Sequence, residues 1–438
     1  MQEMAVSSID CGGVSDAQIE QLARSLYAAQ RSAVYGRMGL STQRHGSLCQ
    51  WLIQLINLYT GQLDRVGGVL PNRTAVPVIG PATSRGARDR WRSRVRGLPE
   101  FSGELPVAAL AEEIETPGEG QIRALLTVAG NPVLSTPQGD RLGKALAQLE
   151  FMVAIDIYRN ETTRHADLIL PPASSLTQDH YDLVFNAFAV RRVARLSAAV
   201  ATRAAQQRGD WEIFNGLAAA FASAAGKSFE PPPEPRALLH WLLQGGDSGV
   251  DLKQLLGAPH GLDLGPLEPC LPGLIQHADK QIQCAPPLLL EALQIYREAS
   301  SQPAAQALAL IGRREVRDNN SWMHNLPRLR KGSSRHALWM HPDDLQARQL
   351  SDGALVQIRS AVGAVRTVVR AREDLLPGVV CLPHGYGHQA SGTAQSLAVE
   401  DPGVSYNDLS DAAVLDMPTG NAALNGTPVW VEAAPEAV

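Results

Sequence analysis

The sequence predicts an α/β protein in which a parallel sheet is followed by a small β-barrel. Three apolar runs, at 122–130, 151–158 and 166–171, flank a stretch at 137–150 that carries leucines on one helical face. Apolar strands that alternate with a helix are typical of a parallel sheet covered on both faces. After about residue 306 the pattern changes to short, closely spaced strands separated by turns. This second pattern predicts a β-barrel that ends near Val431.

Length and composition are those of a globular protein with two or three domains. The chain has 438 residues, of which 45% are hydrophobic and 19% are charged, so it can bury a substantial core. A net charge of −5 gives no indication of a nucleic-acid partner. Apolar runs such as 51–59 are too short to span a bilayer. The N-terminal stretch MQEMAVSSID has no signal-peptide features, so the default expectation is a cytoplasmic protein without a membrane span.

The cysteines and one pair of histidines are the candidates for metal binding. The five cysteines, none in a C-x-x-C pair, are Cys11, Cys49, Cys270, Cys284 and Cys381. This scatter argues against a zinc site, an iron–sulfur cluster and a disulfide scaffold. His384 and His388 have the spacing of zinc ligands on a helix. Two glycines between them disfavour a helix, so no metal site is predicted.

Two helices are expected near the N-terminus. The first covers 15–34, and the second runs from about residue 47 to 59, where Gly61 ends it. The buried stripe expected on the second helix consists of Leu48, Leu52, Leu55, Ile56 and Tyr59. A glycine-punctuated polar loop that contains Gln43 joins the two helices.

A further helix is expected at 208–226, with Asp210 as its N-cap. The prolines of PPPEP at 231–235 break the pattern, and the segment after them has helical character. We therefore expect an α/β domain at 1–305, with a helical insertion at about 227–305. The β-barrel domain is expected at 306–438.

Polar residues follow the first two predicted strands of the sheet. Gly130, Asn131 and Pro132 end the first, and Asp156 ends the second. Ligands of parallel sheets lie at the carboxyl ends of the strands. Gly130 allows a ligand to approach the backbone, and Asn131 can donate and accept hydrogen bonds. Asp156 can accept from ribose hydroxyls. The alternatives are an ordinary Asn-Pro turn and a carboxylate that caps its own loop.

The run GRREVRDNNSWMHN at 312–325 fits neither the helical nor the strand period. Such a density of amides and guanidiniums suits a large polar ligand with phosphates and heterocycles, and the alternative is a surface loop. Gly312 would let a pyrophosphate pass, and Arg313 and Arg314 would neutralise it. The donors and acceptors for a heterocycle would come from Asn319, Asn320, Ser321, His324 and Asn325.

Stretches spread over almost the whole chain resemble one family. They include AGNPVLSTPQGDRL, DIYRNETTRHADLILPPAS, GRREVRDNNSWMHN and GVVCLPHGYGH. The chain resembles the C-terminal part of the molybdopterin oxidoreductases that bind bis(molybdopterin guanine dinucleotide), such as formate dehydrogenase, nitrate reductase and dimethyl sulfoxide reductase. The resemblance implies a Rossmann-like domain followed by a double-psi β-barrel that clamps both pterin dinucleotides.

In that family, a four-cysteine [4Fe–4S] cluster and the segment with the protein ligand to molybdenum precede the region that this chain resembles. The resemblance therefore implies the C-terminal portion only, as a truncated gene product, a split subunit or part of a longer chain. The [4Fe–4S] cluster and any export signal are expected only in that N-terminal region. A companion N-terminal segment or an electron-transfer partner would complete the enzyme.

The resemblance also assigns residues to the cofactor. It places Asn131 on the dinucleotide and gives Asp210 to guanine, whose two adjacent donors a carboxylate can accept; helix capping remains the alternative for Asp210. It further implies cofactor contacts for Gln43, Asn407, Asn425 and the loop with His384. No catalytic residue is assigned.

The function that the resemblance implies is a molybdopterin-dependent oxidoreductase acting on a small molecule, similar to formate dehydrogenase or nitrate reductase. This chain would be the part that binds Mo-bis(molybdopterin guanine dinucleotide). Two alternatives remain. One is a non-catalytic remnant or pterin-dinucleotide-binding module without turnover. The other is an unrelated nucleotide-binding α/β protein, which leaves the barrel unexplained.

Overall fold

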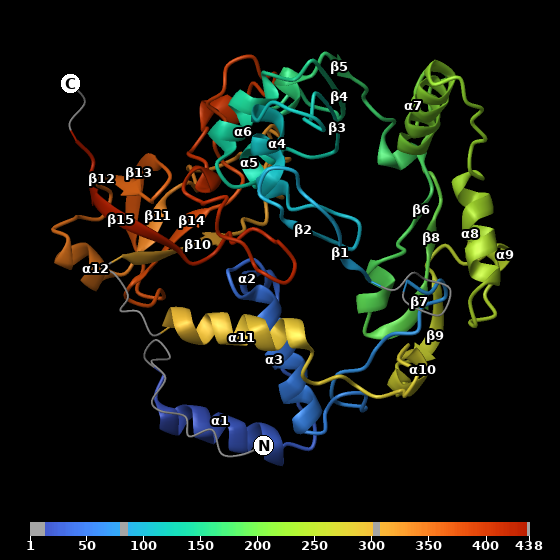
Figure 1. Cartoon of the computed structure of the whole chain (residues 1–438), viewed down its shortest axis with the longest axis horizontal. Helices are drawn as coiled ribbons and strands as arrows, with labels where there is room; N and C mark the ends of the chain where they lie inside the picture. The colour runs from blue at the N-terminus through green and yellow to red at the C-terminus, as the bar shows by residue number, and fades with distance from the viewer. Residues whose placement is uncertain (1–13, 79–85, 301–306, 436–438) are drawn as a thin grey trace.

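The computed structural model describes residues 14–78, 86–300 and 307–435. Cys11 and the expected domain boundary near residue 305 lie outside these ranges. Figure 1 shows the barrel on one side, the three-stranded sheet above it, and a separate lobe around α7 and α8 on the other side. No helix in the described ranges is long and apolar enough to cross a membrane.

The C-terminal part is a closed six-stranded barrel, as predicted. The strands are β10 (Leu308–Arg313), β11 (Leu338–Met340), β12 (Leu355–Arg359), β13 (Ala364–Ala371), β14 (Val379–Pro383) and β15 (Thr427–Ala433), and the short helix α12 (Pro342–Ala347) follows β11. Their order around the barrel is β10-β14-β11-β13-β12-β15. Two pairs, β10 with β14 and β11 with β13, are parallel, and the other neighbours are antiparallel. Side chains such as Leu310, Leu338 and Val380 fill the interior with no exposed surface.

The predicted parallel sheet is present, with three strands in the order β3-β4-β5. The elements of this unit are η1 (Val107–Ala109), α4 (Leu110–Glu115), β3 (Ala124–Val128), α5 (Pro132–Ser135), α6 (Gly139–Leu146), β4 (Phe151–Ile155), η2 (Thr163–His165) and β5 (Leu168–Ile169). Leu142 and Leu146 of α6 pack with Met152 of β4. The predicted leucine face is therefore real.

The expectation that both faces of these strands are covered holds for β4 and is wrong for β3. Residues 152–155 of β4 are buried, whereas Leu126 and Val128 of β3 keep 41% and 43% of their surface exposed. The sheet has only three strands, and β3 lies at its edge.

The N-terminal helices are α1 (Asp16–Ala28), α2 (Met38–Ser41) and α3 (Gly46–Tyr59). The first ends six residues earlier than predicted, because Ala29 has extended backbone angles. The predicted stripe on α3 is confirmed at Leu48, which is buried, and is wrong at Leu52, Ile56 and Tyr59. Leu52 and Ile56 are 40% and 39% exposed, whereas Ile53 and Asn57 are buried. The apolar residues of α3 lie on most sides of the helix, so their spacing could not indicate which side is buried.

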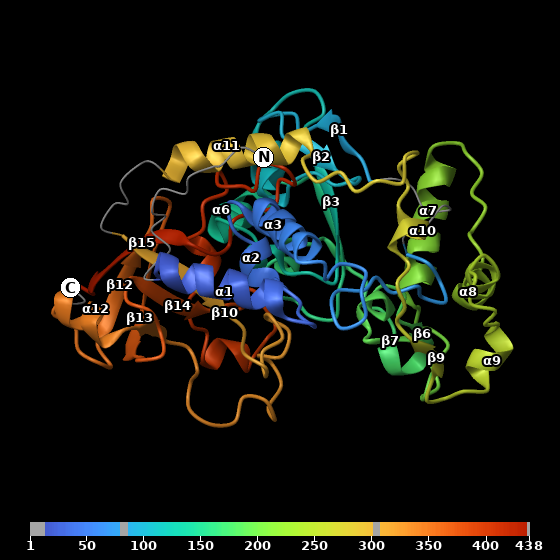
Figure 2. The ribbon, with the colours of Figure 1, turned by 90° about the horizontal axis from the view of Figure 1, so that it is seen from below.

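The buried face of α3 is set by a polar contact. The side chain of Asn57 accepts a hydrogen bond from the backbone N–H of Val34 and donates one to its carbonyl oxygen, both at 2.8 Å. A buried amide needs such partners. Figures 1 and 2 show α11 (Pro287–Ser300) lying along α3.

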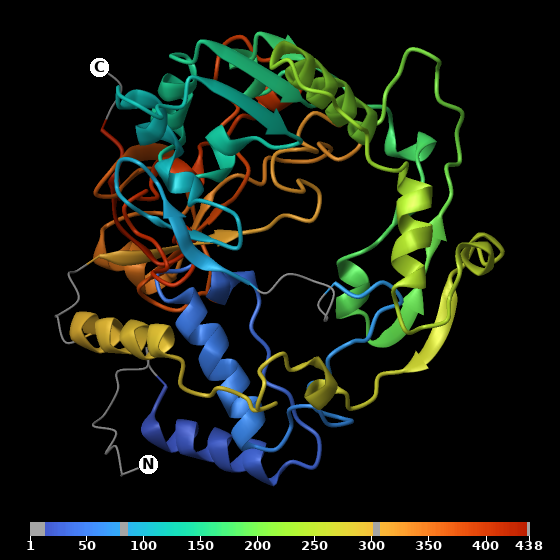
Figure 3. The ribbon, with the colours of Figure 1, turned by 45° about the vertical axis from the view of Figure 1, so that its right-hand side comes forward.

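The separate lobe gathers segments from three parts of the chain. Its elements are β6 (His180–Tyr181), η4 (Phe185–Phe188), β7 (Arg191–Ala194), β8 (Leu196–Ser197), α7 (Asp210–Ala224), α8 (Pro235–Gln244), α9 (Leu252–Leu256), β9 (Leu262–Pro266) and α10 (Leu271–Leu274). Its core contains Val76, Leu196, Leu239 and Leu255. The expected insertion at 227–305 is therefore divided between two parts of the molecule. Its elements α8, α9 and β9 belong to this lobe, whereas α11 lies against α3 (Figure 3). The remaining elements are a two-stranded ribbon and three short helices. The ribbon consists of β1 (Arg88–Arg92) and β2 (Pro99–Phe101), and the helices are η3 (Ser175–Thr177), η5 (Ala398–Glu400) and η6 (Tyr406–Asp408).

Candidate cofactor-binding site

A pocket of about 210 Å³ lies between the carboxyl edge of the sheet and the barrel. The predicted residues that line it are Gly130, Asn131, Arg314, Asn320, Ser321 and His384. Ala129, Leu134, Ser135, Trp322, Gly385 and Leu424 complete the wall. Larger hollows contain none of the predicted residues; one of about 710 Å³ runs along α6 and the loop after Gly387. The sequence candidates thus converge on this pocket from three distant segments.

Arg314 gives the pocket a positive charge. Its guanidinium donates a hydrogen bond to the side-chain oxygen of Asn320. No carboxylate in the described part of the chain forms an ion pair with it. Burial lowers the pKa of Arg314 from its ordinary value, yet an arginine stays protonated in proteins. An unpaired, partly desolvated guanidinium on a pocket wall is suited to an anion such as a phosphate.

His384 lines the same pocket as a neutral imidazole. It is 8% exposed. Burial, and then the nearby charges of Arg314 and His324, lower the pKa of His384 to about 4. No residue within the described ranges hydrogen bonds to its ring. A neutral ring has one donor and one acceptor nitrogen, so His384 can serve either side of a heterocycle.

Asn131 is buried and already holds two partners. Its amide nitrogen donates to Oε2 of Glu161 at 2.7 Å, and its oxygen accepts from the hydroxyl of Thr162 at 2.7 Å. One N–H and one lone pair remain for a ligand. Gly130 shares the wall and Pro132 begins α5. The left-handed backbone lies at Ala129, with φ of 48°, and not at the glycine.

Asp156 caps its own loop, which is the alternative that the sequence left open. Its Oδ1 accepts from the backbone N–H groups of Ile157 and Tyr158, and its Oδ2 accepts from Asn160. The carboxylate is therefore occupied by local donors.

Arg313 differs from its neighbour. It donates to Glu315 and to the backbone carbonyls of Ala337, Arg335 and Cys381, and it lies 3.8 Å above the ring centre of Trp339. It does not line the pocket. The expectation that Arg313 and Arg314 act together on a phosphate therefore finds geometric support for Arg314 alone.

Several predicted residues hold the frame around the pocket. Asn425 accepts from the N–H of Gly312 at 3.0 Å and donates to the hydroxyl of Thr42 at 2.8 Å, so it ties the Gln43 segment to the end of β10. Gln43 itself donates to the sulfur of Cys49 at 3.6 Å. None of these side chains lines the pocket.

Asn407, Asn325 and His324 are also internal. The fully buried Asn407 donates to the carbonyl of Leu134 at 2.7 Å, and Asn325 accepts from the N–H of Leu397 at 2.9 Å. His324 has no exposed surface and lies behind the pocket. These contacts fix the loops that form the wall, and none of the three side chains lines the pocket itself.

Asp210 is the first residue of α7 and not its N-cap. The N-cap is Gly209, whose N–H donates to Glu212 at 2.7 Å. In the described part of the chain no group hydrogen bonds to the carboxylate of Asp210. The capping alternative for Asp210 is therefore wrong, and its half-buried carboxylate is free.

Sequence reasoning missed residues whose importance depends on distant partners. Gly385 has φ of 92°, and a Cβ there would lie 2.2 Å from the carbonyl oxygen of Asn320. Only glycine permits this close approach of the two loops. The two glycines of the HGYGH run were the available signal. Asp318, which is 1% exposed, is a buried carboxylate that no local pattern distinguishes.

The two histidines four residues apart do not form a pair. His388 contacts Glu161 and His324, whereas His384 lines the pocket. No group of three or more His, Cys, Asp or Glu side chains suited to a metal is found within the described ranges.

Two family models match the chain over both parts of this site. A molybdopterin oxidoreductase model matches residues 13–220, and a molydopterin dinucleotide binding domain model matches residues 308–428. Both matches are to parts that molybdopterin oxidoreductases contain, and together they take in both walls of the pocket. The prediction of a C-terminal portion alone is too narrow, because the oxidoreductase model matches from residue 13 onward.

Named relatives agree with this family. The dimethyl sulfoxide/trimethylamine N-oxide reductase of Rhodobacter capsulatus is 23% identical over 481 residues, covering 95% of this chain and 55% of that protein. The assimilatory nitrate reductase catalytic subunit of Bacillus subtilis is 35% identical over 126 residues, covering 28% of this chain and 16% of that protein.

Among solved structures, acetylene hydratase from Pelobacter acetylenicus matches with a TM-score of 0.58 at 15% identity, over 76% of this chain and 47% of that one. At that identity the likeness shows the fold alone. This chain spans about half the length of the dimethyl sulfoxide reductase and of the hydratase.

Proposed function

We propose that this chain is the cofactor-holding part of a molybdopterin-dependent oxidoreductase. The observation that carries the proposal is the pocket in which Gly130 and Asn131 of the α/β part meet Arg314, Asn320 and His384 of the barrel part. The two walls come from the two regions that match the two family models. A ligand in this pocket would contact both parts of the chain.

The residues fit a portion of a pterin dinucleotide. A pocket of about 210 Å³ is smaller than the roughly 300–1,000 Å³ of most ligand sites, so it admits one ring system with a neighbouring phosphate group and not a whole dinucleotide. Arg314 would bind the phosphate, and Asn131, Asn320 and His384 would face the edge of a heterocycle. The rest of a large cofactor would extend beyond this pocket.

The finer form of the proposal is Mo-bis(molybdopterin guanine dinucleotide), held between a Rossmann-like domain at 1–305 and a double-psi barrel at 306–438. When bound, this group supplies the two-electron chemistry at the metal. The residues of this chain bind the dinucleotide, orient it and exclude water from it. A small molecule would be the substrate, as for a formate dehydrogenase or nitrate reductase. A companion segment would supply the ligand to molybdenum and any [4Fe–4S] cluster.

The direct test is the cofactor content of the purified chain, expressed alone and together with a companion segment from the same genome. We expect molybdenum and guanine nucleotide, released by acid hydrolysis, in near-stoichiometric amounts with the companion present. Nucleotide without molybdenum or turnover in both preparations would instead identify a binding module. Absence of both from both preparations would contradict the proposal.

Asp210→Asn separates guanine recognition from helix stability. Because Gly209 is the N-cap, the substitution removes only a charge near the helix N-terminus, which is worth about 0.3–1 kcal/mol. If Asp210 accepts from guanine, the amide places a donor against a donor, and binding weakens by about 1–3 kcal/mol. We expect unchanged thermal stability and reduced guanine content. Equal guanine content in variant and wild type would remove Asp210 from the proposed site.

A further inference from the structure

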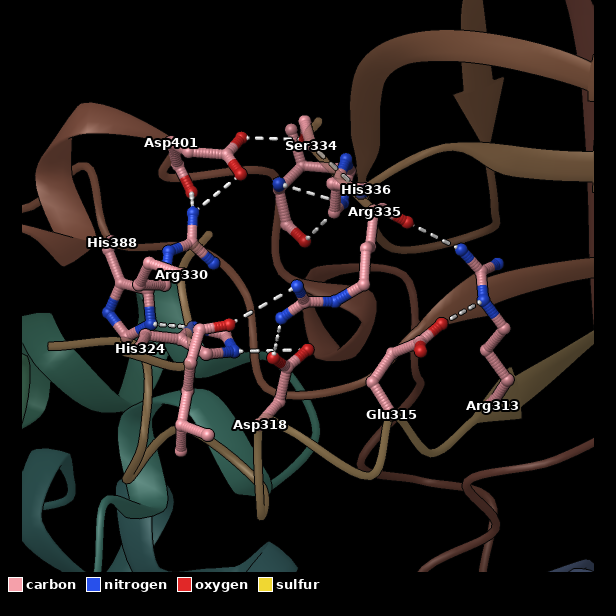
Figure 4. A network of polar contacts seen from close by, with 12 residues as sticks. Arg313, Glu315, Asp318, His324, Arg330, Ser334, Arg335, His336, His388 and Asp401 are labelled. Carbon is pink, nitrogen blue, oxygen red and sulfur yellow. Dashed lines mark hydrogen bonds and ion pairs between the residues drawn. The ribbon is translucent and has the colours of Figure 1, made fainter. Parts of the chain in front are cut away.

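A line of buried polar side chains crosses from the sheet to the barrel behind the pocket. Oε1 of Glu161 lies 2.9 Å from Nδ1 of His388, and Nε2 of His388 lies 2.6 Å from Nδ1 of His324. Nε2 of His324 lies 3.3 Å from Oδ2 of Asp318, whose other oxygen accepts from Arg335 at 2.5 Å. Figure 4 shows the barrel part of this line, with His324 between His388 and Asp318. Glu161 comes from the α/β part of the chain.

Both ends of the line are carboxylates that can only accept. The oxygens of Glu161 accept from His388 and from Asn131, so neither carries a proton. Burial raises the pKa of Glu161, but the hydrogen bond and charge of His388 outweigh burial and hold that pKa below its ordinary value. At the other end of the line, burial also raises the pKa of Asp318. The contacts with His324 and Arg335 outweigh it and lower the pKa of Asp318 to about 2.

The line of contacts that links the two carboxylates through the two histidines requires one proton more than two neutral imidazoles carry. The contact of His388 with Glu161 needs one N–H group, and the contact of His324 with Asp318 needs a second. The 2.6 Å contact between the two rings needs a third N–H group. Two neutral imidazoles carry only two N–H groups. The contact between His324 and Asp318 is poorly aligned, yet neither of these two buried atoms has another partner among the described residues. An unprotonated nitrogen there would face a carboxylate oxygen, so the third N–H is needed and one ring must be an imidazolium.

The additional proton belongs on His388. Among the described residues, His388 is the side chain that forms an ion pair with Glu161, whereas Asp318 is already paired with Arg335. Burial also lowers the pKa of His324. With His388 charged, Glu161 and Asp318 are balanced by His388 and Arg335, and the buried group is neutral overall. This balance avoids the large cost of an unpaired buried charge.

Two further carboxylates near this group, Asp401 and Glu315, are already paired with Arg330 and Arg313. The titratable or charged groups around the two rings are Glu161, Asp318, Arg330, Arg335, His336, His384 and Tyr386. Of these only Glu161 and Asp318 are negative, because burial raises the pKa of Tyr386 to about 12.

We propose that His388 is a buried imidazolium that joins Glu161 of the sheet to His324 and Asp318 of the barrel, and that Glu161 is thereby a positioning residue of the pocket. The same carboxylate orients a pocket residue, since its Oε2 accepts from Asn131. The hydroxyl of Thr162 accepts from the N–H of Val133 at 3.1 Å and therefore donates to Asn131. The orientation of the Asn131 amide is fixed from both sides. This inference concerns the protein alone and holds whatever ligand occupies the pocket.

The protonation state can be measured directly in the full chain. In protein labelled with ¹⁵N-histidine, we expect one histidine to show two protonated ring nitrogens at about pH 7.5, where a free histidine of pKa about 6.5 is largely neutral. The signal is assigned by its absence in His388→Gln. If no histidine of the wild type shows two protonated ring nitrogens at that pH, the proposal fails, and this result needs no variant that folds.

The positioning role is tested by Glu161→Gln. The amide of the new side chain would present a donor to Asn131 or to His388, so one of the two contacts is lost. We expect loss of the imidazolium signal and at least tenfold faster hydrogen exchange of backbone amides at 129–135 and 384–388. Glu150→Gln is the matched control, because it breaks an exposed ion pair with Arg123 in the same α/β unit. Unchanged exchange in Glu161→Gln, or equal acceleration in Glu150→Gln, would overturn the positioning role.

Discussion

Replacing Asp318 by asparagine is expected to lower the free energy of unfolding by about 3–5 kcal/mol, the usual cost of breaking a buried ion pair. Asp318 is 1% exposed and binds Arg335 at 2.5 Å. The amide cannot balance this guanidinium, and it faces the imidazole of His324 with no negative charge. The measurement is urea unfolding followed by tryptophan fluorescence. Asp374→Asn is the control, since Asp374 forms an exposed ion pair with Arg372 at 2.7 Å and its loss is expected to be near neutral.

The same residue predicts an acid dependence with a definite sign. The folded-state pKa of Asp318 is about 2, below its ordinary value of 3.8. A carboxyl whose pKa is lowered by folding stabilises the protein above its unfolded pKa, and this contribution is lost as the pH falls toward the folded pKa. Wild-type stability should therefore decline between about pH 4 and pH 2, and Asp318→Asn should lack this part of the slope. Parallel pH curves for the two proteins would contradict the assignment.

Periodicity was sufficient for the elements whose burial repeats regularly. The barrel strands alternate buried and exposed side chains, as at 364–371, and the leucines of α6 recur on one helical face. It failed on α3 and β3. In α3 a single amide contact between Asn57 and Val34 decides which side is buried. In β3 the exposure depends on how many neighbouring strands and helices exist, which a local pattern does not contain.

The candidate site divides in the same way. Residues at strand ends could be found in the sequence, because the ends of parallel strands meet at one edge. The adjacent Arg313 and Arg314 could not be separated, although successive side chains of an extended chain point in opposite directions. Which of them faces the pocket depends on Trp339, which stacks on Arg313 from a different strand. The pair of His324 and His388 likewise joins residues 64 positions apart.

Arg314→Ala is expected to reduce the cofactor content of the purified protein more than any other single change in the pocket. The proposed function gives Arg314 a phosphate, and a hydrogen bond to a charged group contributes about 1.5–3 kcal/mol. That loss corresponds to a drop in affinity of roughly ten- to a hundredfold. The measurement is guanine nucleotide and molybdenum per chain, after purification under identical conditions.

Two further substitutions show whether this loss belongs to the pocket. Arg314→Lys keeps the positive charge and loses the planar fork, so its cofactor content should lie between those of the alanine variant and the wild type. Arg317→Ala removes an exposed arginine from the same loop, where it lies 3.5 Å from the carbonyl of Lys331, and should leave the content unchanged. Wild-type content in Arg314→Ala would remove the anion-binding role from the proposal. Equal losses in Arg314→Ala and Arg317→Ala would point to the general positive charge of the loop. Because Arg314 forms no ion pair with any described carboxylate, its removal should leave thermal stability nearly unchanged, which separates lost binding from lost folding.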